Sequence, residues 1–306
     1  MLVGLSGGAD SVALTLLLRD LSRHDGFSLV GLGHVNHRLR PTAPRDEQFC
    51  REFAERLGLP ITVESVDVTG YAAAQGLSTE DAARRLRYES LHRAATAAGA
   101  EQIAVGHTRD DQAETFLLKL IRGAGLTGLG GIHPRRGQLI RPLLDVGRAE
   151  LRTFLASRGE SWMEDETNQD VENPRNRIRH RVLPELDLAY GAETSPAIAR
   201  AAALVREEDQ WLDEVSARRV EALVARSDDG LRISADALGA EPVALRRRII
   251  LKALRLAAPD RQFGLTHVDA VFDVVAGDSA GADLPGVRVE LRRGKLVLQS
   301  RRVDAK

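Results

Sequence analysis

The chain has 306 residues, of which 43% are hydrophobic and 28% charged, and its formal net charge is −1. This length favours two domains, and no apolar run approaches the roughly 20 residues of a membrane-spanning helix, so no membrane association is expected. The single cysteine, Cys50, excludes intrachain disulfides, cysteine-based zinc sites and paired-thiol redox chemistry, and we expect a cytoplasmic protein.

The first half of the sequence alternates short apolar runs with amphipathic segments. It predicts strands at residues 3–5, 28–35, 61–66 and 102–107, each followed by a helix, at residues 11–21, 46–58, 78–99 and 109–122. Such alternation predicts a doubly wound, mostly parallel sheet with helices on both faces. Ligands bind these sheets at the carboxyl ends of the strands, so residues 6–11, the segment after residue 35 and residues 106–114 should border one crevice.

The pattern changes near residue 187. Helices are predicted at about residues 197–225, 242–256 and 266–275, and the alternation of residues 287–300 around Arg293-Gly294 predicts a hairpin. The sequence therefore predicts a first domain over residues 1–187 and a smaller, mainly helical α+β domain over residues 188–306.

The loop SGGADS, residues 6–11, has the composition of a phosphate-binding turn at a helix start. Its glycines allow the backbone to approach an oxyanion, and the helix N-terminus favours negative charge. The loop lacks the lysine that reaches the β- and γ-phosphates in enzymes attacking the terminal phosphorus. Ser6 and Ser11 could instead hold the pyrophosphate part and Asp10 could hold Mg²⁺, which favours attack at the α-phosphorus. A turn that only caps the helix is the alternative.

Acidic residues follow the fourth predicted strand. Asp110, Asp111 and Glu114 come directly after His107, and Asp111 and Glu114 are three apart, so they share one helix face. Acids at a helix start also serve as caps. Three carboxylates and a histidine beside a phosphate loop exceed what capping requires, so we expect them to recognise an ammonium group or to receive its proton.

Arginines are concentrated in RNRIRHR, residues 175–181, in Arg246-Arg247-Arg248 and near the C-terminus. Arg175 and Arg179 are one helical turn apart, with asparagine and histidine between the arginines. A solvated surface helix is one interpretation. Several such clusters favour a polyanionic partner, and the mixed side chains suit contacts to phosphates and an RNA base.

SGGADS resembles the PP-loop signature of the ATP pyrophosphatase superfamily. Within residues 2–186, the motifs HVNHRLR, ARRLRYESL, GHTRDDQAETFLLKLIRGAGLTGLGGI, IRPLL and DETNQDVENPRNRIRHRVLPEL resemble the tRNA(Ile)-lysidine synthetase family, and the C-terminal third resembles it more loosely. Arg38 stands where the family usually has glycine. The chain ends where longer members continue into a further domain, so it resembles the short form, and it begins almost on the first strand, which leaves room for missing leader residues.

The resemblance implies a ligase that forms a C–N bond and converts ATP to AMP and pyrophosphate with Mg²⁺. ATP would adenylate the first anticodon cytidine of a minor isoleucine tRNA with the anticodon CAU. Free L-lysine would then displace AMP to give lysidine, so that the tRNA reads AUA rather than AUG. Residues 1–187 would form the PP-loop catalytic domain and residues 188–306 the tRNA-binding domain, and since the family is often dimeric a homodimer is among the expected assemblies.

The family's functional residues map onto this sequence position by position. The ATP-binding residues would be Ser6, Gly7, Gly8, Ala9, Asp10, Ser11 and Gly106. Asp10 would face Mg²⁺, and Asp111 and Glu114 would hold lysine or take its proton, because the attacking amine must be neutral. Either Arg175 or Arg179 would offset developing phosphate charge near the reacting centre.

Two other functions remain open at this point. A PP-loop tRNA 2-thiolation enzyme would share the loop but would need reactive cysteines. A non-catalytic tRNA-binding protein would bind tRNA without consuming ATP.

Overall fold

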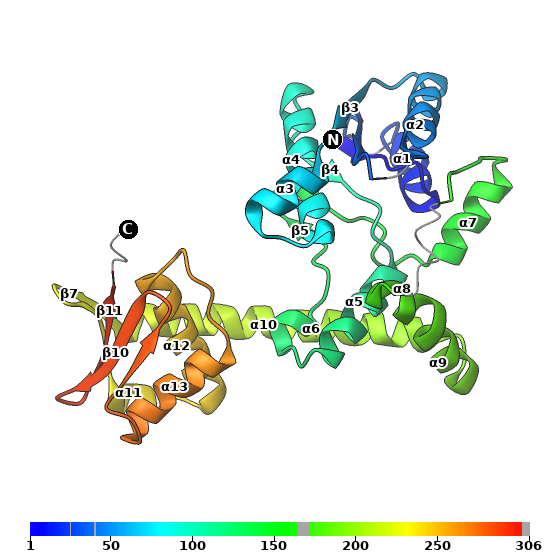
Figure 1. The fold of residues 1–306 in the computed structure, drawn as a ribbon. Helices are drawn as coiled ribbons and strands as arrows, with labels where there is room; N and C mark the ends of the chain where they lie inside the picture. Colours follow the sequence, from blue (N-terminus) through cyan, green and yellow to red (C-terminus); the bar gives the residue numbers. More distant parts are fainter. Residues whose placement is uncertain (25, 40, 165–171, 302–306) are drawn as a thin grey trace. The chain divides into compact units, whose positions relative to one another are not determined.

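The computed structural model describes residues 1–24, 26–39, 41–164 and 172–301. The chain forms two compact units, Met1–Arg206 and Glu207–Lys306 (Figure 1). No helix in the described part is long and apolar enough to cross a membrane.

The first unit is built on a six-stranded sheet in the order β3-β2-β1-β4-β6-β5. The strands are β1 (Leu2–Gly4), β2 (Gly31–Asn36), β3 (Ile61–Ser65), β4 (Ile103–Ala104), β5 (Arg135–Arg136) and β6 (Leu139–Ile140). All pairs are parallel except β5 with β6. The chain moves outward from β1 to β2 and β3 and then returns to β4 on the other side of β1. The carboxyl ends of β1 and β4 therefore flank the switch point, where doubly wound sheets bind ligands.

Helices cover both faces of this sheet. They are α1 (Ala9–Leu21), α2 (Ala43–Leu57), α3 (Val68–Gln75), α4 (Thr79–Ala97), α5 (Arg109–Ile121), α6 (Leu126–Leu129), α7 (Arg148–Ser157), α8 (Pro174–Arg177), the π-helical turn η2 (Ile178–Val182) and α9 (Leu183–Tyr190). Val3 packs in one core with α1, α2 and α7, whereas its neighbour Leu2 packs in another with Leu91 of α4. Successive residues of a strand point to opposite faces, so β1 is buried on both. The predicted doubly wound sheet is confirmed.

One predicted strand is much shorter than expected. The fourth strand was predicted over residues 102–107, but β4 contains only Ile103–Ala104. Gly106 leaves the sheet and lies against the backbone of α1, where an added Cβ would be 3.1 Å from the carbonyl carbon of Asp10. The helix α3 was not predicted.

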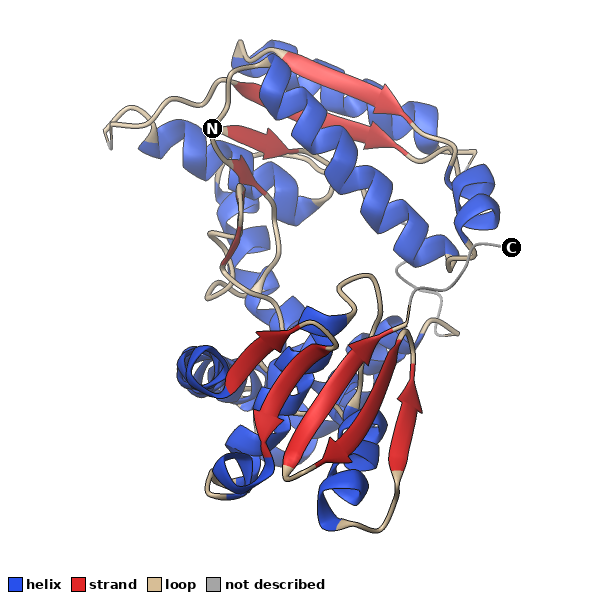
Figure 2. Cartoon of the chain, turned by 90° about the vertical axis from the view of Figure 1, so that its left-hand side faces the viewer, coloured by secondary structure: helices blue, strands red, loops and turns tan. Residues whose placement is uncertain are grey.

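The second unit is a five-stranded antiparallel sheet in the order β7-β8-β11-β10-β9. Its strands are β7 (Val224–Ser227), β8 (Gly230–Ser234), β9 (Gly281–Leu284), β10 (Val287–Arg292) and β11 (Lys295–Ser300), and its helices are α11 (Ala235–Gly239), α12 (Val243–Ala257) and α13 (Leu265–Ala276). Figure 2 shows this sheet face on, with helices behind it. The hairpin of β10 and β11 is confirmed, and its turn residues Arg293 and Gly294 have φ of 49° and 72°, as a type I′ turn requires. The strands β7, β8 and β9 were not predicted, so this unit contains more sheet than expected.

The helix α10 (Thr194–Leu223) begins in the first unit and ends in the second. The sequence pattern predicts a boundary at residues 187/188, whereas the compact units meet at residues 206/207. Ile198 packs with Ala113 of α5 and Ile178 of η2, and Arg206 donates to the carbonyl oxygens of Gly130 and Ile132 at 3.1 and 3.2 Å. These contacts explain why residues 188–206 pack with the first unit.

We expect the second unit to tolerate replacement of the Leu256 side chain by alanine, but not replacement of the Leu254 side chain. Leu254 is 0% exposed and Leu256 is 48% exposed on the same helix, α12. Leu254→Ala should lower the free energy of unfolding by about 2–5 kcal/mol, because it leaves a cavity. Leu256→Ala should change it by less than about 0.5 kcal/mol. Urea unfolding of the full chain measures both, and equal losses would contradict the packing described above.

Candidate active site

The loop after β1 is shaped by its own hydroxyl groups. Gly7 has φ of +88°, and its carbonyl oxygen accepts from the N–H of Met163 at 2.9 Å. The Oγ of Ser11 accepts from the N–H of Ser6 at 3.1 Å and lies 3.1 Å from the Oγ of Ser6. Gly8 is the N-cap of α1 and no side chain caps this helix. The first turn of α1 therefore presents N–H groups without a side-chain partner, as an anion-binding helix start requires.

Gly106, at the exit of β4, fits closely against this loop. An added Cβ would be 3.1 Å from the Asp10 carbonyl group and 3.2 Å from the Ser11 nitrogen. A larger residue would push the two backbones apart. The segments that follow β1 and β4 approach each other closely at Gly106, which explains why glycine occupies this predicted ATP-binding position.

The predicted acids and arginines meet in one buried cluster, which also contains Arg148. Glu114 is 0% exposed, and its Oε1 accepts from Nη1 of Arg148 at 2.8 Å and Nε of Arg179 at 2.7 Å. Its Oε2 accepts from Nε of Arg175 at 2.8 Å and Nη2 of Arg179 at 3.0 Å. A carboxylate offers about four acceptor positions, so those of Glu114 are all used.

The acceptor positions of the Asp111 carboxylate are also all used. Its Oδ2 accepts from the N–H of Thr108 at 2.8 Å and from the Thr108 hydroxyl at 3.0 Å. Its Oδ1 accepts from Nη2 of Arg148 and, at 3.0 Å, from Nη2 of Arg175. Asp111 thereby caps α5 and joins the arginine cluster at once, so capping alone does not account for its contacts.

The charges of the cluster determine how its acids titrate. Burial alone would raise the pKa of Asp111, but Arg148 and Arg175 outweigh burial and lower it to about 2. Burial opposes ionisation of Glu114 in the same way, and the bonds from Arg179 and the charge of Arg148 lower its pKa. Both groups are therefore ionised at neutral pH and are poor proton acceptors in this arrangement.

Asp10 has a different environment. Its Oδ2 lies 3.4 Å from Nε of Arg148, and its side chain is 26% exposed. Burial raises the pKa of Asp10 to about 6, because the attraction of Arg148 only partly offsets desolvation and Asp111 repels the charge. The described residues contain no group of three or more His, Cys, Asp or Glu side chains that could hold a metal. Mg²⁺ usually takes one or two carboxylates together with substrate phosphates and water, so Asp10 at the phosphate loop fits that ion.

Arg148 was missed by the sequence analysis. It is the first residue of α7, and its backbone N–H donates to Oδ2 of Asp110 at 2.8 Å. A cation is disfavoured at a helix N-terminus by the helix dipole. An arginine at the start of a predicted helix could therefore have indicated nearby carboxylates that stabilise its charge. Asp110 caps α7 rather than joining the cluster.

The other predicted residues lie around this cluster. Arg175 lies in α8 and Arg179 in η2, and π-helical turns are frequent at functional sites. The Nδ1 atom of His107 is buried and has no described hydrogen-bond partner, and desolvation lowers the pKa of the ring to about 4, so the ring is neutral at pH 7. Residues 40 and 165–171, which belong to two of the motifs, lie outside the described residues.

Cys50 lies beneath the phosphate loop. It is fully buried, and an added Cβ on Gly7 would be 3.4 Å from its Sγ. Burial raises the pKa of the thiol to about 12. The thiolate is the reactive form of cysteine, so Cys50 is unreactive at neutral pH.

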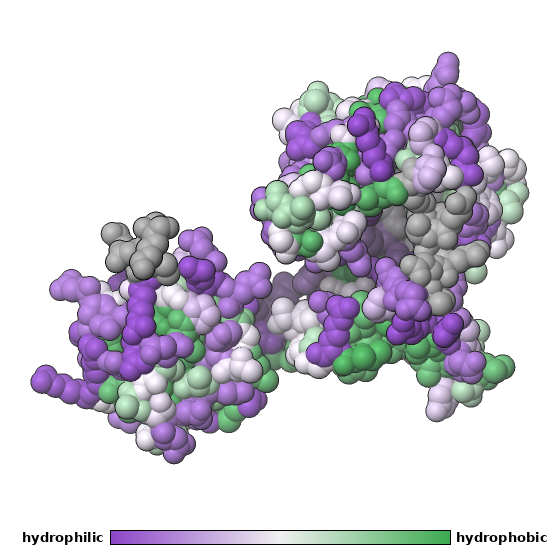
Figure 3. All heavy atoms as spheres, viewed as in Figure 1, coloured by the Kyte–Doolittle hydropathy of each residue, from purple (hydrophilic) through white to green (hydrophobic). Residues whose placement is uncertain are grey.

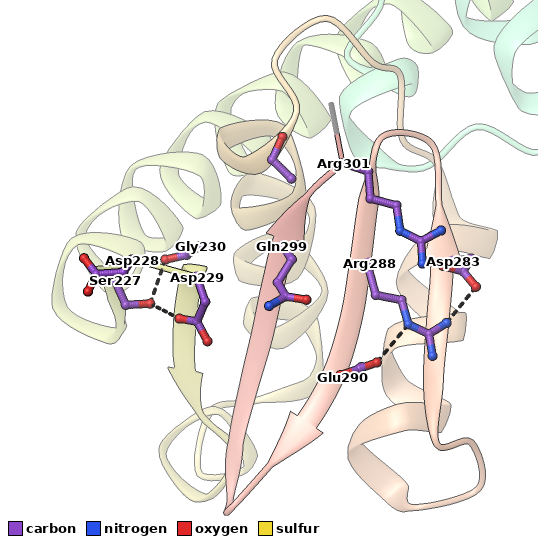
Figure 4. A pocket seen from close by; sticks show the side chains of 10 residues that line it. Ser227, Asp228, Asp229, Gly230, Asp283, Arg288, Glu290, Gln299 and Arg301 are labelled. Atoms are coloured by element: carbon purple, nitrogen blue, oxygen red, sulfur yellow. Dashed lines mark hydrogen bonds and ion pairs between the residues drawn. The ribbon is translucent and has the colours of Figure 1, made fainter. Parts of the chain in front are cut away.

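The exposed face of the second unit's sheet contains an open hollow of 790 Å³ (Figure 4). Arg288 lies between Asp283 and Glu290, and Arg301 pairs with Asp283 at 2.8 Å. Figure 3 shows mostly hydrophilic residues on the face where β10 and β11 lie. Because these arginines are neutralised by neighbouring acids, the hollow offers little net positive charge to a polyanion.

Two arginines of α12 contact an aromatic ring, whereas Arg288 and Arg301 pair with acids. Arg246 and Arg247 lie over the ring of Phe272, at 5.8 and 6.0 Å from its centroid, and within the described residues they form no ion pair. Arg248, by contrast, pairs with Asp209. The side chain of Arg247 is exposed. Within the described residues, the cationic side chains of α12 that form no ion pair are those of Arg246, Arg247 and Arg255.

Known proteins resemble this chain in sequence and in fold. Residues 1–186 match the family model of the PP-loop domain. The chain is 38% identical to tRNA(Ile)-lysidine synthase of Geobacter sulfurreducens, over 98% of this chain and 63% of that protein. It is 43% identical to tRNA(Ile)-lysidine synthase of Thermus thermophilus, over 72% of this chain and 42% of that protein. The chain thus spans less than two thirds of either relative.

Among solved structures, the U34-tRNA thiolase NcsA from Methanococcus maripaludis, determined with its [4Fe-4S] cluster, aligns with a TM-score of 0.56. The two chains are 20% identical, and the alignment covers 67% of this chain and 71% of the thiolase. At that identity the similarity shows a shared fold.

We expect Asp111→Asn to destabilise the chain by about 3–5 kcal/mol at pH 7, because it removes one of the anions that neutralise the guanidinium groups of Arg148 and Arg175. The pKa of Asp111 is about 2 in the folded chain, below its ordinary value of 3.8, so its ionised form stabilises the fold above pH 3.8 and this contribution is lost as the pH falls toward 2. The difference in unfolding free energy between wild type and variant should therefore shrink below about pH 4. Urea unfolding between pH 7 and 3 measures it.

The control is Asp145→Asn, which changes an exposed carboxylate without a described ion pair in the same unit. It should change the unfolding free energy by less than about 0.5 kcal/mol. A loss for Asp111→Asn that stays constant from pH 7 to 3 would contradict the assignment of the low pKa to this residue.

Proposed function

This chain belongs to the PP-loop family of ATP-binding domains, and from that premise we propose that it joins free L-lysine to the first anticodon cytidine of a minor isoleucine tRNA with the anticodon CAU. The product is lysidine, and the tRNA then reads AUA rather than AUG. The observation that carries the proposal is the position of the acid–arginine cluster directly beside the phosphate loop at the switch point of the sheet. The names of the relatives matched above support the same reaction.

The loop at residues 6–11 would bind ATP through its pyrophosphate part. The uncapped N–H groups of α1 would donate to it, and the hydroxyl of Ser11, which binds Ser6 and the Gly8 carbonyl oxygen, would hold the loop in shape. Asp10 would hold Mg²⁺, which neutralises phosphate charge when bound. Because the loop contains no lysine to reach the terminal phosphate, it suits attack at the α-phosphorus, with adenylation of the cytidine carbonyl and departure of pyrophosphate.

The cluster would serve the second step, in which the lysine amine attacks the adenylated carbon and AMP leaves. Asp111 and Glu114 would hold the amine end of lysine. Arg175 and Arg179 reach Glu114 together, and Arg175 also contacts Asp111. We assign both arginines the task of fixing the acids and of offsetting charge on the departing phosphate.

The second unit would bind tRNA outside the anticodon. Arg246 and Arg247 of α12 form no ion pair within the described residues, whereas Arg288 and Arg292 of the sheet are paired with acids. Contacts from arginine to phosphate position a nucleic acid without reading its sequence.

Thiolation of tRNA is the weaker alternative. It requires a cysteine that can form a thiolate, but the pKa of the only cysteine in this sequence is raised to about 12 by burial. The similarity to the tRNA thiolase extends to the fold and gives no support to that reaction.

The proposed reaction predicts that purified protein, ATP, Mg²⁺, labelled L-lysine and unmodified isoleucine tRNA with the anticodon CAU will give labelled tRNA and pyrophosphate. Asp10→Ala and Glu114→Ala should abolish labelling, and circular dichroism of Asp10→Ala should show that the fold survives. A non-catalytic tRNA-binding protein would bind the tRNA without releasing pyrophosphate. Wild-type protein that leaves the tRNA unlabelled over a range of magnesium and salt concentrations would refute the proposal.

The assignment of tRNA contacts to α12 predicts a difference between two arginines. Arg247→Ala should weaken tRNA binding and reduce the slope of log affinity against log salt by about 1, since one phosphate contact is lost. Arg288→Ala should leave the slope unchanged, because that guanidinium is held by Asp283 and Glu290. Filter binding at several salt concentrations measures both, and equal effects would contradict the assignment.

A further inference from the structure

The two acids proposed to bind lysine have no free acceptor position in this structure. Each accepts four hydrogen bonds, two on each carboxylate oxygen. A lysine ammonium has three N–H donors and needs acceptors for them. The substrate amine can therefore bind between Asp111 and Glu114 only if one of the three arginines leaves.

Arg148 is the arginine whose departure suits this exchange. Within the described part of the chain, it is the arginine that contacts all three carboxylates of the cluster: Asp10, Asp111 and Glu114. When it leaves, one acceptor position is freed on Oδ1 of Asp111 and one on Oε1 of Glu114, while Oδ2 of Asp10 becomes available to Mg²⁺. These two positions can accept two of the three N–H donors of an ammonium group.

Glu114 and Asp111 keep their other hydrogen-bond donors after this exchange. Glu114 keeps Arg175 and Arg179, and Asp111 keeps Arg175 and Thr108. The charge beside Asp111 and Glu114 also stays balanced, because the lysine ammonium replaces the Arg148 guanidinium there. Adding lysine without releasing an arginine would place four cations against three anions in a buried site, which is unfavourable.

Arg148 also connects the lysine side of the cluster to the nucleotide side. Its Nε faces Asp10, the residue proposed to hold Mg²⁺ at the phosphate loop. An ion that takes Asp10 removes one of the three partners of Arg148, and nucleotide phosphates on the adjacent loop offer the guanidinium a bidentate partner in exchange. Both changes favour departure of Arg148 from Asp111 and Glu114.

We propose that the Arg148 guanidinium occupies the place of the substrate amine, and that binding of ATP with Mg²⁺ releases it, so that lysine binds well only to the nucleotide-bound protein. This inference rests on the proposed function. It makes Arg148 a positioning residue that couples the two substrates. Such coupling is reciprocal, so lysine must strengthen nucleotide binding by the same factor.

Isothermal titration of wild-type protein with L-lysine tests the coupling directly. The titration is made without nucleotide and then with Mg²⁺ and α,β-methylene ATP, which cannot release pyrophosphate. The affinity for lysine should rise by about tenfold or more with nucleotide, within the usual range of coupling between sites. Norleucine, which has the same chain length but no ε-amine, should show no such rise.

Arg148→Gln should remove the dependence on nucleotide. Without nucleotide, its affinity for lysine should approach that of the nucleotide-bound wild type, and nucleotide should then change it by less than about twofold. Arg148→Lys, which keeps a cation at this position, should retain the dependence. The matched control is Arg152→Gln, one turn further along α7, whose exposed side chain pairs with Glu164. It should behave as wild type.

The outcomes separate this inference from the proposed function. Wild type that binds lysine equally well with and without nucleotide would overturn the coupling and leave the ligase assignment intact. So would an Arg148→Gln variant that folds but still needs nucleotide to bind lysine. Wild type that binds no lysine even with nucleotide would overturn both. If Arg148→Gln does not fold, the wild-type titrations and Arg148→Lys still decide.

Discussion

The site depends on the mutual neutralisation of three carboxylates and three guanidinium groups in a buried space. Glu114 is fully buried, and burying an ionised carboxylate is very costly unless opposite charges and hydrogen bonds replace its hydration. Arg148, Arg175 and Arg179 supply that replacement. The cluster therefore limits which groups can bind in the site. A cation that enters must form the hydrogen bonds and ion pairs of the cation that it replaces.

The topology of the sheet explains how this cluster can form. Asp10 follows β1, Asp111 and Glu114 follow β4, and the chain order reverses between these two strands. Their carboxyl ends therefore open on the same edge. The helices α7 and α8, which bring Arg148 and Arg175, come later in the chain and close over that edge. The phosphate loop and the acid pair meet because β1 and β4 are neighbours, although about 100 residues separate them in the sequence.

Several features could be read from local sequence because they depend on neighbouring residues. The alternation of apolar runs and amphipathic helices predicted the parallel sheet, and Arg293-Gly294 predicted a hairpin that β10 and β11 form. The glycines and hydroxyl groups of residues 6–11 predicted a phosphate-binding loop. The strands β7, β8 and β9 were missed, since short strands in an antiparallel sheet have weak local signals. The first compact unit extends to Arg206, beyond the predicted boundary at residue 187, because Ile198 and Arg206 contact residues far away in the chain.

The sequence by itself determined the residue types of the site and the class of reaction they suit: a lysine-free phosphate loop, an acid pair three residues apart, and two arginines one helical turn apart. Only the tertiary structure decided what those groups face. It placed Arg148 between Asp10, Asp111 and Glu114, from positions 34 to 138 residues away along the chain. The physical reason is that spacing along a helix fixes which side chains share a face, whereas the partner of a buried charge depends on which segments the folded chain brings within a few ångströms.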